Sequence, residues 1–100
     1  MTHIVLLAPL AVQDLIALHD WVREAAGRTL ADRYLDRIEA KVAGLAQFPM
    51  RGTPRDDLAR GVRTLVFERK LIIAYRIEEQ TVRVLRIISG QRELAPLLER

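Results

Sequence analysis

Apolar residues recur with a helical period through the first half of the chain. Two such stripes lie on either side of Gly27, and the polar residues of the first helix fall largely outside its stripe. Pro9 suits the first turn of that helix, where a missing N–H costs nothing. The stripes consist of Ala11, Leu15, Leu18 and Val22, and then of Ala31, Tyr34, Leu35, Ile38, Val42 and Leu45. The pattern predicts an antiparallel hairpin of two helices, which ends at the breaks formed by Pro49, Gly52 and Pro54.

Two shorter features flank the helices. Residues 3–7 form an apolar run that is typical of a β-strand. Residues 29–32, Thr-Leu-Ala-Asp, have the pattern of a capping box and predict a side-chain cap at the start of the second helix.

The second half of the chain has the composition of β-strands. Residues 62–68, 70–78 and 81–89 are rich in Val, Ile and Leu, with weak alternation. A two-residue connection at 79–80 would join the last two strands as a hairpin. The expected partners in that register are Arg76 with Arg83, Ala74 with Leu85, and Ile72 with Ile87.

One face of this β-hairpin is the more apolar, and we expect the helices to cover it. Its members are Leu71, Ile73, Tyr75, Ile77, Val82, Val84, Arg86 and Ile88. Arg86 would lie near the margin with its stem buried and its head reaching out. The predicted fold is therefore α+β, in a single domain of residues 1–100. It consists of an N-terminal strand at a sheet edge, a helical hairpin, three antiparallel strands, and a short C-terminal tail or helix.

Composition excludes several kinds of chemistry. The chain has no cysteine, so it has no disulfide, thiolate metal site or thiol nucleophile. His3 and His19 lack the spacing of a zinc site, and we expect no metal and no cofactor. The apolar run at residues 4–12 is far shorter than the ~18 residues that a membrane span needs. These features fit a cytoplasmic protein.

Positive charge is concentrated in the second half of the chain. Residues 51–100 hold eleven basic and seven acidic side chains, against five and six in residues 1–50. Fourteen of the sixteen cations are Arg, whose planar fork suits phosphate and carboxylate. The strand and loop arginines are Arg63, Arg69, Arg76, Arg83, Arg86 and Arg92. They either solvate the strand ends and discourage edge-to-edge pairing, or form an electropositive surface for an acidic partner.

Five segments together resemble the ParE/RelE superfamily of bacterial toxin–antitoxin systems. They are "APLAVQDLIALHDWV", "ADRYLDRIEAKVAGLAQFPMRG", "DLARGVRTL", "IIAYRI" and "VRVLRIISGQRE". The resemblance is most specific at four places: Asp14-Leu15 with Trp21-Val22, the turn Leu45…Pro49…Gly52, Gly61-x-Arg63, and Tyr75 with the loop residue Arg92. It covers nearly the whole chain, in order.

The resemblance implies one of two activities. RelE-like members are ribosome-dependent mRNA endonucleases, whereas ParE-like members with known targets poison DNA gyrase and are neutralised by a ParD-type antitoxin. An RNase needs groups that accept and donate protons beside its cations. Arg92 matches the arginine that follows the last strand, but Ile72 stands where RelE-like enzymes hold an arginine, and Ser89 where related toxins often have His. The tail segment "APLLER" has no Tyr or His. This argues against a nuclease.

We therefore expect a non-catalytic toxin that inhibits gyrase, arrests growth and stabilises plasmids, with a ribbon-helix-helix, acidic-tailed ParD-like antitoxin as partner. The alternatives are a RelE-like endonuclease, or a degenerate toxin that acts only in an autorepressor complex. The expected target-binding residues are Arg63, Arg76, Arg83, Arg86 and Arg92. The expected antitoxin-binding residues are Leu15, Leu18, Trp21, Tyr75, Leu97 and Leu98.

Overall fold

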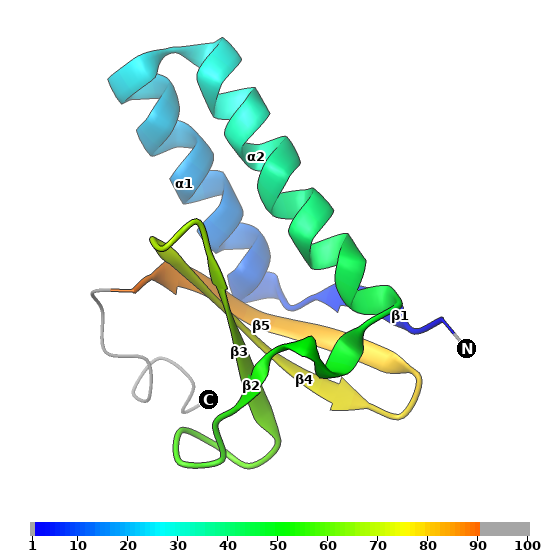
Figure 1. Cartoon of the computed structure of the whole chain (residues 1–100). Coiled ribbons are helices and arrows are strands. Elements are labelled where there is room, and N and C mark those ends of the chain that lie inside the picture. Colours follow the sequence, from blue (N-terminus) through cyan, green and yellow to red (C-terminus); the bar gives the residue numbers. More distant parts are fainter. Residues whose placement is uncertain (1, 91–100) are drawn as a thin grey trace.

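A helical hairpin covers one face of a five-stranded sheet (Figure 1). The computed structural model describes residues 2–90. The helices are α1 (Pro9–Ala26) and α2 (Arg28–Ala43), and two short 3₁₀ turns follow, η1 (Gly44–Ala46) and η2 (Pro49–Arg51). The strands are β1 (Ile4–Leu7), β2 (Thr53–Pro54), β3 (Val62–Phe67), β4 (Leu71–Glu78) and β5 (Thr81–Ser89). The predicted α+β class is confirmed, and the expected tail helix lies outside the described residues.

α1 begins and ends at the residues predicted to delimit it, but the predicted N-terminal cap of α2 is absent. Pro9 is the first residue of α1, and Gly27 ends that helix with φ of 93°, a conformation that glycine adopts without a steric penalty. The same glycine precedes α2, so that the second helix starts at Arg28. No side chain caps this start, and the predicted capping box at residues 29–32 is wrong. Asp32 instead binds His19 of α1.

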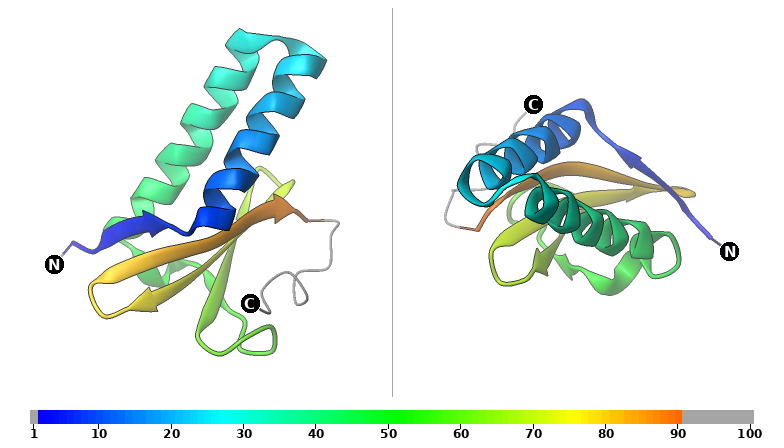
Figure 2. Two further views of the ribbon diagram at one scale, coloured as in Figure 1. Left: turned by 180° about the vertical axis from the view of Figure 1, so that it is seen from behind. Right: turned by 90° about the horizontal axis from the view of Figure 1, so that it is seen from above.

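The sheet has the strand order β1-β5-β4-β3-β2. β1 pairs in parallel with β5 at one edge, as predicted for the isolated N-terminal strand. β3, β4 and β5 form an antiparallel meander. The edge strand β2, only two residues long, was not predicted because Pro54 lies in it and cannot donate a ladder hydrogen bond. The left view of Figure 2 shows β1 lying beside β5, below the N-terminal end of α1.

A β-bulge shifts the register of the β4–β5 hairpin. Arg76 lies opposite Arg83, as predicted, but Tyr75 pairs with Val84 and Ala74 with Arg86, so that Leu85 is the extra residue. The expected Ala74–Leu85 pair is therefore wrong, and so is the Ile72–Ile87 pair, because Ile72 pairs with Ile88. An inserted residue reverses the faces of every residue beyond it.

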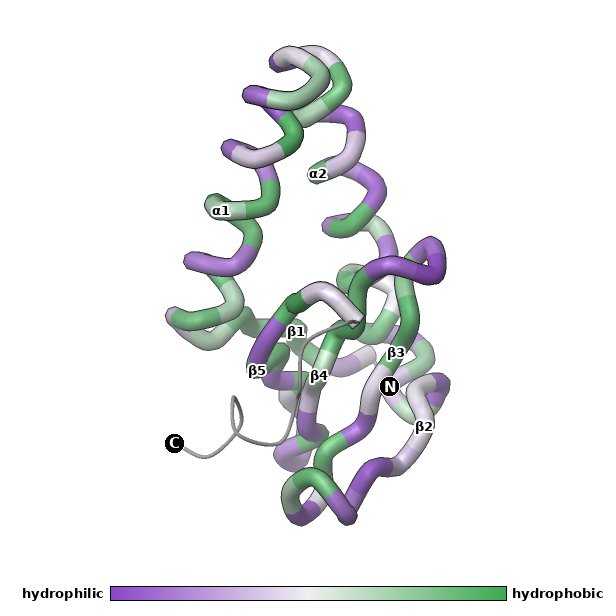
Figure 3. Tube along the Cα trace, turned by 90° about the vertical axis from the view of Figure 1, so that its left-hand side faces the viewer, coloured by the Kyte–Doolittle hydropathy of each residue, from purple (hydrophilic) through white to green (hydrophobic). Residues whose placement is uncertain are grey.

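The bulge also corrects the composition of the face that the helices cover. The core between helices and sheet contains Ile87 in place of Ile88, beside Leu71, Ile73 and Tyr75. Ile88 joins Val62 and Ala74 in a smaller cluster on the opposite face. In Figure 3 green stretches alternate with white and purple ones along the strands beneath the helices, and the turn between β3 and β4 is purple. No helix among residues 2–90 is long and apolar enough to cross a membrane.

Candidate functional site

The buried hydroxyl of Tyr75 holds the loop between α2 and β2. Tyr75 is 0% exposed, and its Oη accepts a hydrogen bond from Gly52 N–H (2.8 Å) and donates one to the carbonyl of Pro49 (2.7 Å). Burial raises the pKa of this phenol. Tyr75 was expected to contact an antitoxin. In the structure the ring lies inside the core, and the hydroxyl makes its hydrogen bonds within the fold.

Position 52 lies so close to Tyr75 that only glycine, which has no Cβ, fits there. A Cβ added there would lie 2.5 Å from Tyr75 Oη and 2.9 Å from the backbone oxygen of Thr64. Pro49 starts the 3₁₀ turn η2 and presents its carbonyl to the same hydroxyl. The Pro49, Gly52 and Tyr75 features of the sequence are thus parts of one structural unit, which joins the loop to β4.

Arg63 and Arg76 also hold loop backbone. Nη1 of Arg63 donates to the carbonyls of Gly52 (2.7 Å) and Met50 (3.1 Å). Nε of Arg76 donates to the carbonyl of Arg60 (3.1 Å). Both arginines were predicted to bind a target, but these guanidinium hydrogen bonds shape the 49–61 region of the protein itself.

The other two predicted arginines in the described chain pair with carboxylates. Arg83 lies 3.0 Å from Glu78 and stays partly exposed at the β4–β5 turn. Arg86 forms a fork with Asp14 of α1, with Nε–Oδ2 at 2.8 Å and Nη2–Oδ1 at 2.9 Å, and both side chains are 13% exposed. Asp14 Oδ2 also accepts the Ile87 N–H at 2.9 Å. The hydrogen bonds that Arg86 donates to the Asp14 carboxylate raise the pKa of Arg86.

This fork corrects the expectation that the Arg86 head reaches into solvent. β1 ends at Leu7, opposite Val84, so within residues 2–90 β5 has no strand neighbour on that side beyond that point. The carboxylate of Asp14 fills the place of a strand there, since it accepts the backbone N–H of Ile87 as well as the guanidinium of Arg86. Asp14, one of the positions at which the sequence resembles the superfamily, therefore has a structural role in this chain, since it joins α1 to β5.

The predicted antitoxin-binding residues fall into three groups. Leu15 is 7% exposed and belongs to the core, as its place in the apolar stripe of the first helix predicted, so that little of its side chain is accessible to a partner. Leu18 is half-buried against that core, and Trp21 is 70% exposed on α1. Leu97 and Leu98 lie outside the described residues, as does Arg92 among the target-binding candidates. Among the described residues, the accessible part of the predicted antitoxin surface is thus Trp21, with the partly exposed Leu18.

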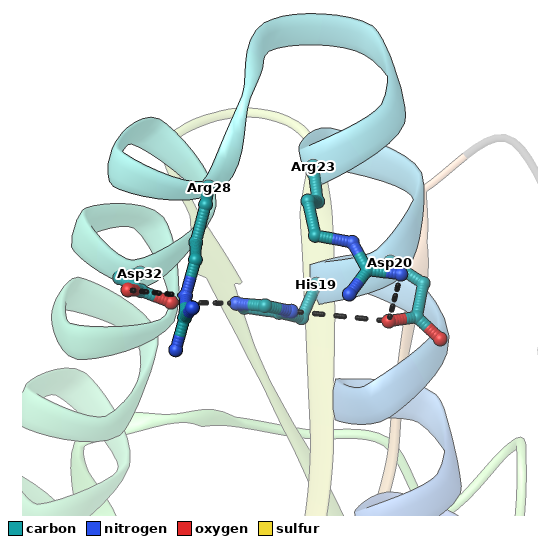
Figure 4. A network of polar contacts seen from close by, with 5 residues as sticks. All are labelled: His19, Asp20, Arg23, Arg28 and Asp32. Carbon is teal, nitrogen blue, oxygen red and sulfur yellow. Dashed lines mark hydrogen bonds and ion pairs between the residues drawn. The ribbon is translucent and has the colours of Figure 1, made fainter.

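Sequence reasoning missed a polar link near the tip of the helical hairpin (Figure 4). Nε2 of His19 lies 2.7 Å from Oδ1 of Asp32, which ties α1 to α2. Asp20, Arg23 and Arg28 surround the pair as looser ion contacts of 3.6–3.9 Å. Over residues 2–90 no group of His, Asp and Glu side chains has the arrangement of a metal site.

A cleft of about 230 Å³ opens between β1 and the two helices. Its lining is apolar apart from one carboxylate, and consists of Val5, Leu7, Leu15, Glu39, Val42 and Ala43. Neither histidine and neither tyrosine lines it. From residues 2–90 the cleft therefore receives one proton donor or acceptor of the kind an RNase needs, the Glu39 carboxylate.

The sequence of the chain matches a known protein family and a curated relative. Residues 5–94 match the family described as ParE toxin of type II toxin-antitoxin system, parDE. Toxin ParE3 of Caulobacter vibrioides is 36% identical over 77 residues, which cover 77% of this chain and 76% of that protein.

Solved structures agree with this placement. The chromosomal ParDE toxin–antitoxin system from P. aeruginosa contains a chain that superposes with a TM-score of 0.78 at 27% identity, covering 88% of this chain and 96% of that one. The toxin–antitoxin complex RelBE2 from Mycobacterium tuberculosis shares the fold, with a TM-score of 0.68 at 24% identity over 89% of this chain and 99% of that one. The chain belongs to the ParE toxin family of type II toxin–antitoxin systems.

Proposed function

We propose that this ParE-family toxin arrests growth by inhibiting DNA gyrase through protein–protein contacts, and that a ParD-like antitoxin neutralises it. The observation that carries the proposal is the role of the sheet arginines. Arg63 and Arg76 donate to loop carbonyls, and Arg86 is forked onto Asp14. An RNase needs cations that are available to the phosphate in the transition state. In the described part of the chain these three are committed to the fold.

The surface supports a protein partner. Trp21 is largely exposed on α1, where Val12 and Ile16 are exposed as well. Exposed aromatic side chains of this kind anchor protein–protein interfaces. An amphipathic helix of an acidic antitoxin would place its apolar anchors against α1 and its carboxylates near the basic second half of the chain. The ParDE structure from P. aeruginosa supports an antitoxin of the ParD type.

A co-expression experiment tests both parts of the proposal. The toxin is induced alone or together with the product of the adjacent ribbon-helix-helix frame. We expect filamentation and DNA-damage signalling with the toxin alone, and normal growth when the two co-purify. A chain that stays non-toxic at high expression and does not bind the neighbouring product would contradict the proposal, and would favour a degenerate toxin.

The RelE-like alternative has one observation in its favour, the fold that the chain shares with the M. tuberculosis RelBE2 complex. An endonuclease would stop translation at once and leave codon-phased mRNA ends. The gyrase-inhibiting toxin would stop replication first, with translation continuing.

A further inference from the structure

The loop that follows η1 exposes two large apolar side chains that are two positions apart in the sequence. Phe48 is 63% exposed and Met50 is 64% exposed, on either side of Pro49. Arg51 follows them, is exposed too, and its guanidinium has no hydrogen bond or ion pair within residues 2–90. Phe, Met and Arg are enriched in the centres of protein interfaces.

The backbone of this loop is held firmly although its side chains face solvent. Tyr75 Oη binds Gly52 N–H and the Pro49 carbonyl, and Arg63 Nη1 binds the carbonyls of Met50 and Gly52. The loop is also closed locally, with Phe48 N–H on the Gly44 carbonyl at 3.2 Å. A buried tyrosine and a part-buried arginine thus fix the backbone from which the apolar pair projects.

Rigid presentation is what distinguishes this patch from scattered surface hydrophobes. A single exposed apolar residue on a soluble protein needs no explanation. Here two lie within three residues, on a segment whose conformation is set by four side-chain hydrogen bonds. They lie beside Arg51, a cation without an ion pair among residues 2–90. A preformed loop loses little conformational entropy when a partner binds it, so the interface gains affinity.

We propose that residues 48–51 are the surface through which the toxin docks onto its target protein, an inference that rests on the proposed function. The occupant is a protein surface with an apolar cleft for Phe48 and Met50 and a carboxylate that meets Arg51. Figure 1 shows the segment between α2 and β2 below the C-terminal end of α2. The last turns of α1, which contain Trp21, lie towards the tip of the hairpin, so a partner on α1 and a partner on this loop use different surfaces.

Two variants test the surface. Phe48→Ser/Met50→Ser removes the apolar pair, and Arg51→Glu reverses the charge. The matched controls are Val66→Thr, an exposed apolar residue of β3, and Arg33→Glu, an exposed arginine of α2 with no ion pair in the described structure. Each is assayed for growth arrest after induction at equal protein level, for thermal unfolding, and for binding to purified DNA gyrase and to the product of the adjacent antitoxin frame.

We expect both loop variants to lose affinity for gyrase by about tenfold or more and to arrest growth weakly. Their unfolding temperatures should stay within about 2 °C of the wild type, because the changed side chains are exposed. Antitoxin binding should be unchanged, and both controls should behave like the wild type.

The opposing outcomes are distinct. If the wild-type chain arrests growth and the loop variants arrest it equally, this inference is wrong and the proposed function stands. If the loop variants lose antitoxin binding while keeping gyrase affinity, the loop is an antitoxin surface and the inference is wrong in its occupant. If the wild-type chain neither arrests growth nor binds gyrase, the proposed function fails and the inference with it.

Discussion

Replacing Gly52 by alanine should destabilise the protein, although its backbone conformation is open to any residue. Its φ of −75° and ψ of 161° are ordinary extended values. The cost is steric, because the new Cβ would lie 2.5 Å from Tyr75 Oη, 2.8 Å from Tyr75 Cε1 and 2.9 Å from Thr64 O. The last contact is with sheet backbone, so the loop must move away from β3 and β4.

Two terms set the magnitude. Forcing a methyl group into a filled site costs about 1–3 kcal/mol. Moving the loop also breaks the hydrogen bonds of the Tyr75 hydroxyl to Gly52 and Pro49, and each buried polar group left without a partner costs about 1–3 kcal/mol. The sum is at least about 2 kcal/mol. In a chain of this size that lowers the unfolding temperature by about 8 °C or more.

The assay is thermal and urea unfolding followed by circular dichroism. Gly44→Ala is the matched control, since Gly44 has helical φ and ψ of −63° and −18° and an added Cβ would only touch Arg51 Nη1 at 3.6 Å. That change should be neutral or slightly stabilising. Tyr75→Phe separates the terms, because it removes the hydrogen bonds without adding volume. If Gly52→Ala unfolds at the same temperature as Gly44→Ala, the close contact between Gly52 and Tyr75 does not exist in solution.

Three further changes test other parts of the account. Asp14→Ala should lower the free energy of unfolding, measured in urea, by about 2 kcal/mol, because Arg86 and the Ile87 N–H lose this acceptor in a mostly buried place. The control Asp36→Ala, on the exposed surface of α2, should stay within about 0.5 kcal/mol of the wild type, and equal values for the two variants would contradict the Asp14–Arg86 pair. Burial raises the pKa of Tyr75 above that of a free tyrosine. The stabilisation that its neutral hydroxyl provides is complete below the pKa of the unfolded chain and is lost as the pH rises through the folded-state pKa. The unfolding temperature of the wild type should therefore fall at alkaline pH more steeply than that of Tyr75→Phe, and parallel curves would refute this. Trp21→Ser should leave the free energy of unfolding within about 0.5 kcal/mol of the wild type, because Trp21 is exposed. It should weaken binding of the ParD-like antitoxin by about tenfold or more in biolayer interferometry, and unchanged affinity would show that Trp21 is not part of the interface.

The order of the two helices and the four longer strands could be predicted because each of these elements rests on a local pattern. Pro9 and Gly27 delimit α1, and the apolar stripes of both helices supply the core residues Leu15, Ile38 and Val42. The bulge at Leu85 could not be predicted in this way, since no Gly or Pro marks it and weak alternation fits either register. The capping box failed for a related reason: Asp32 has a tertiary partner in His19, which competes with any local cap.

The candidate site was harder to predict because an arginine's role depends on what lies within reach of its guanidinium. Arg63 looked like a surface cation on a strand, yet its donors meet two carbonyls of a loop eleven and thirteen residues away. Tyr75 was found as a special position, but its partner Gly52 is brought to it only by the path of the chain through η2. The exposed pair Phe48 and Met50 gave no periodic signal, because both lie in an irregular loop.

The most direct test of the central claim is to trap covalent gyrase–DNA complexes, and to map mRNA 5′ ends from the same cells, within minutes of inducing the toxin. A non-catalytic gyrase inhibitor predicts accumulating gyrase–DNA complexes with mRNA ends unchanged from uninduced cells. Codon-phased mRNA cleavage without trapped gyrase would contradict the account and assign the chain an endonuclease activity.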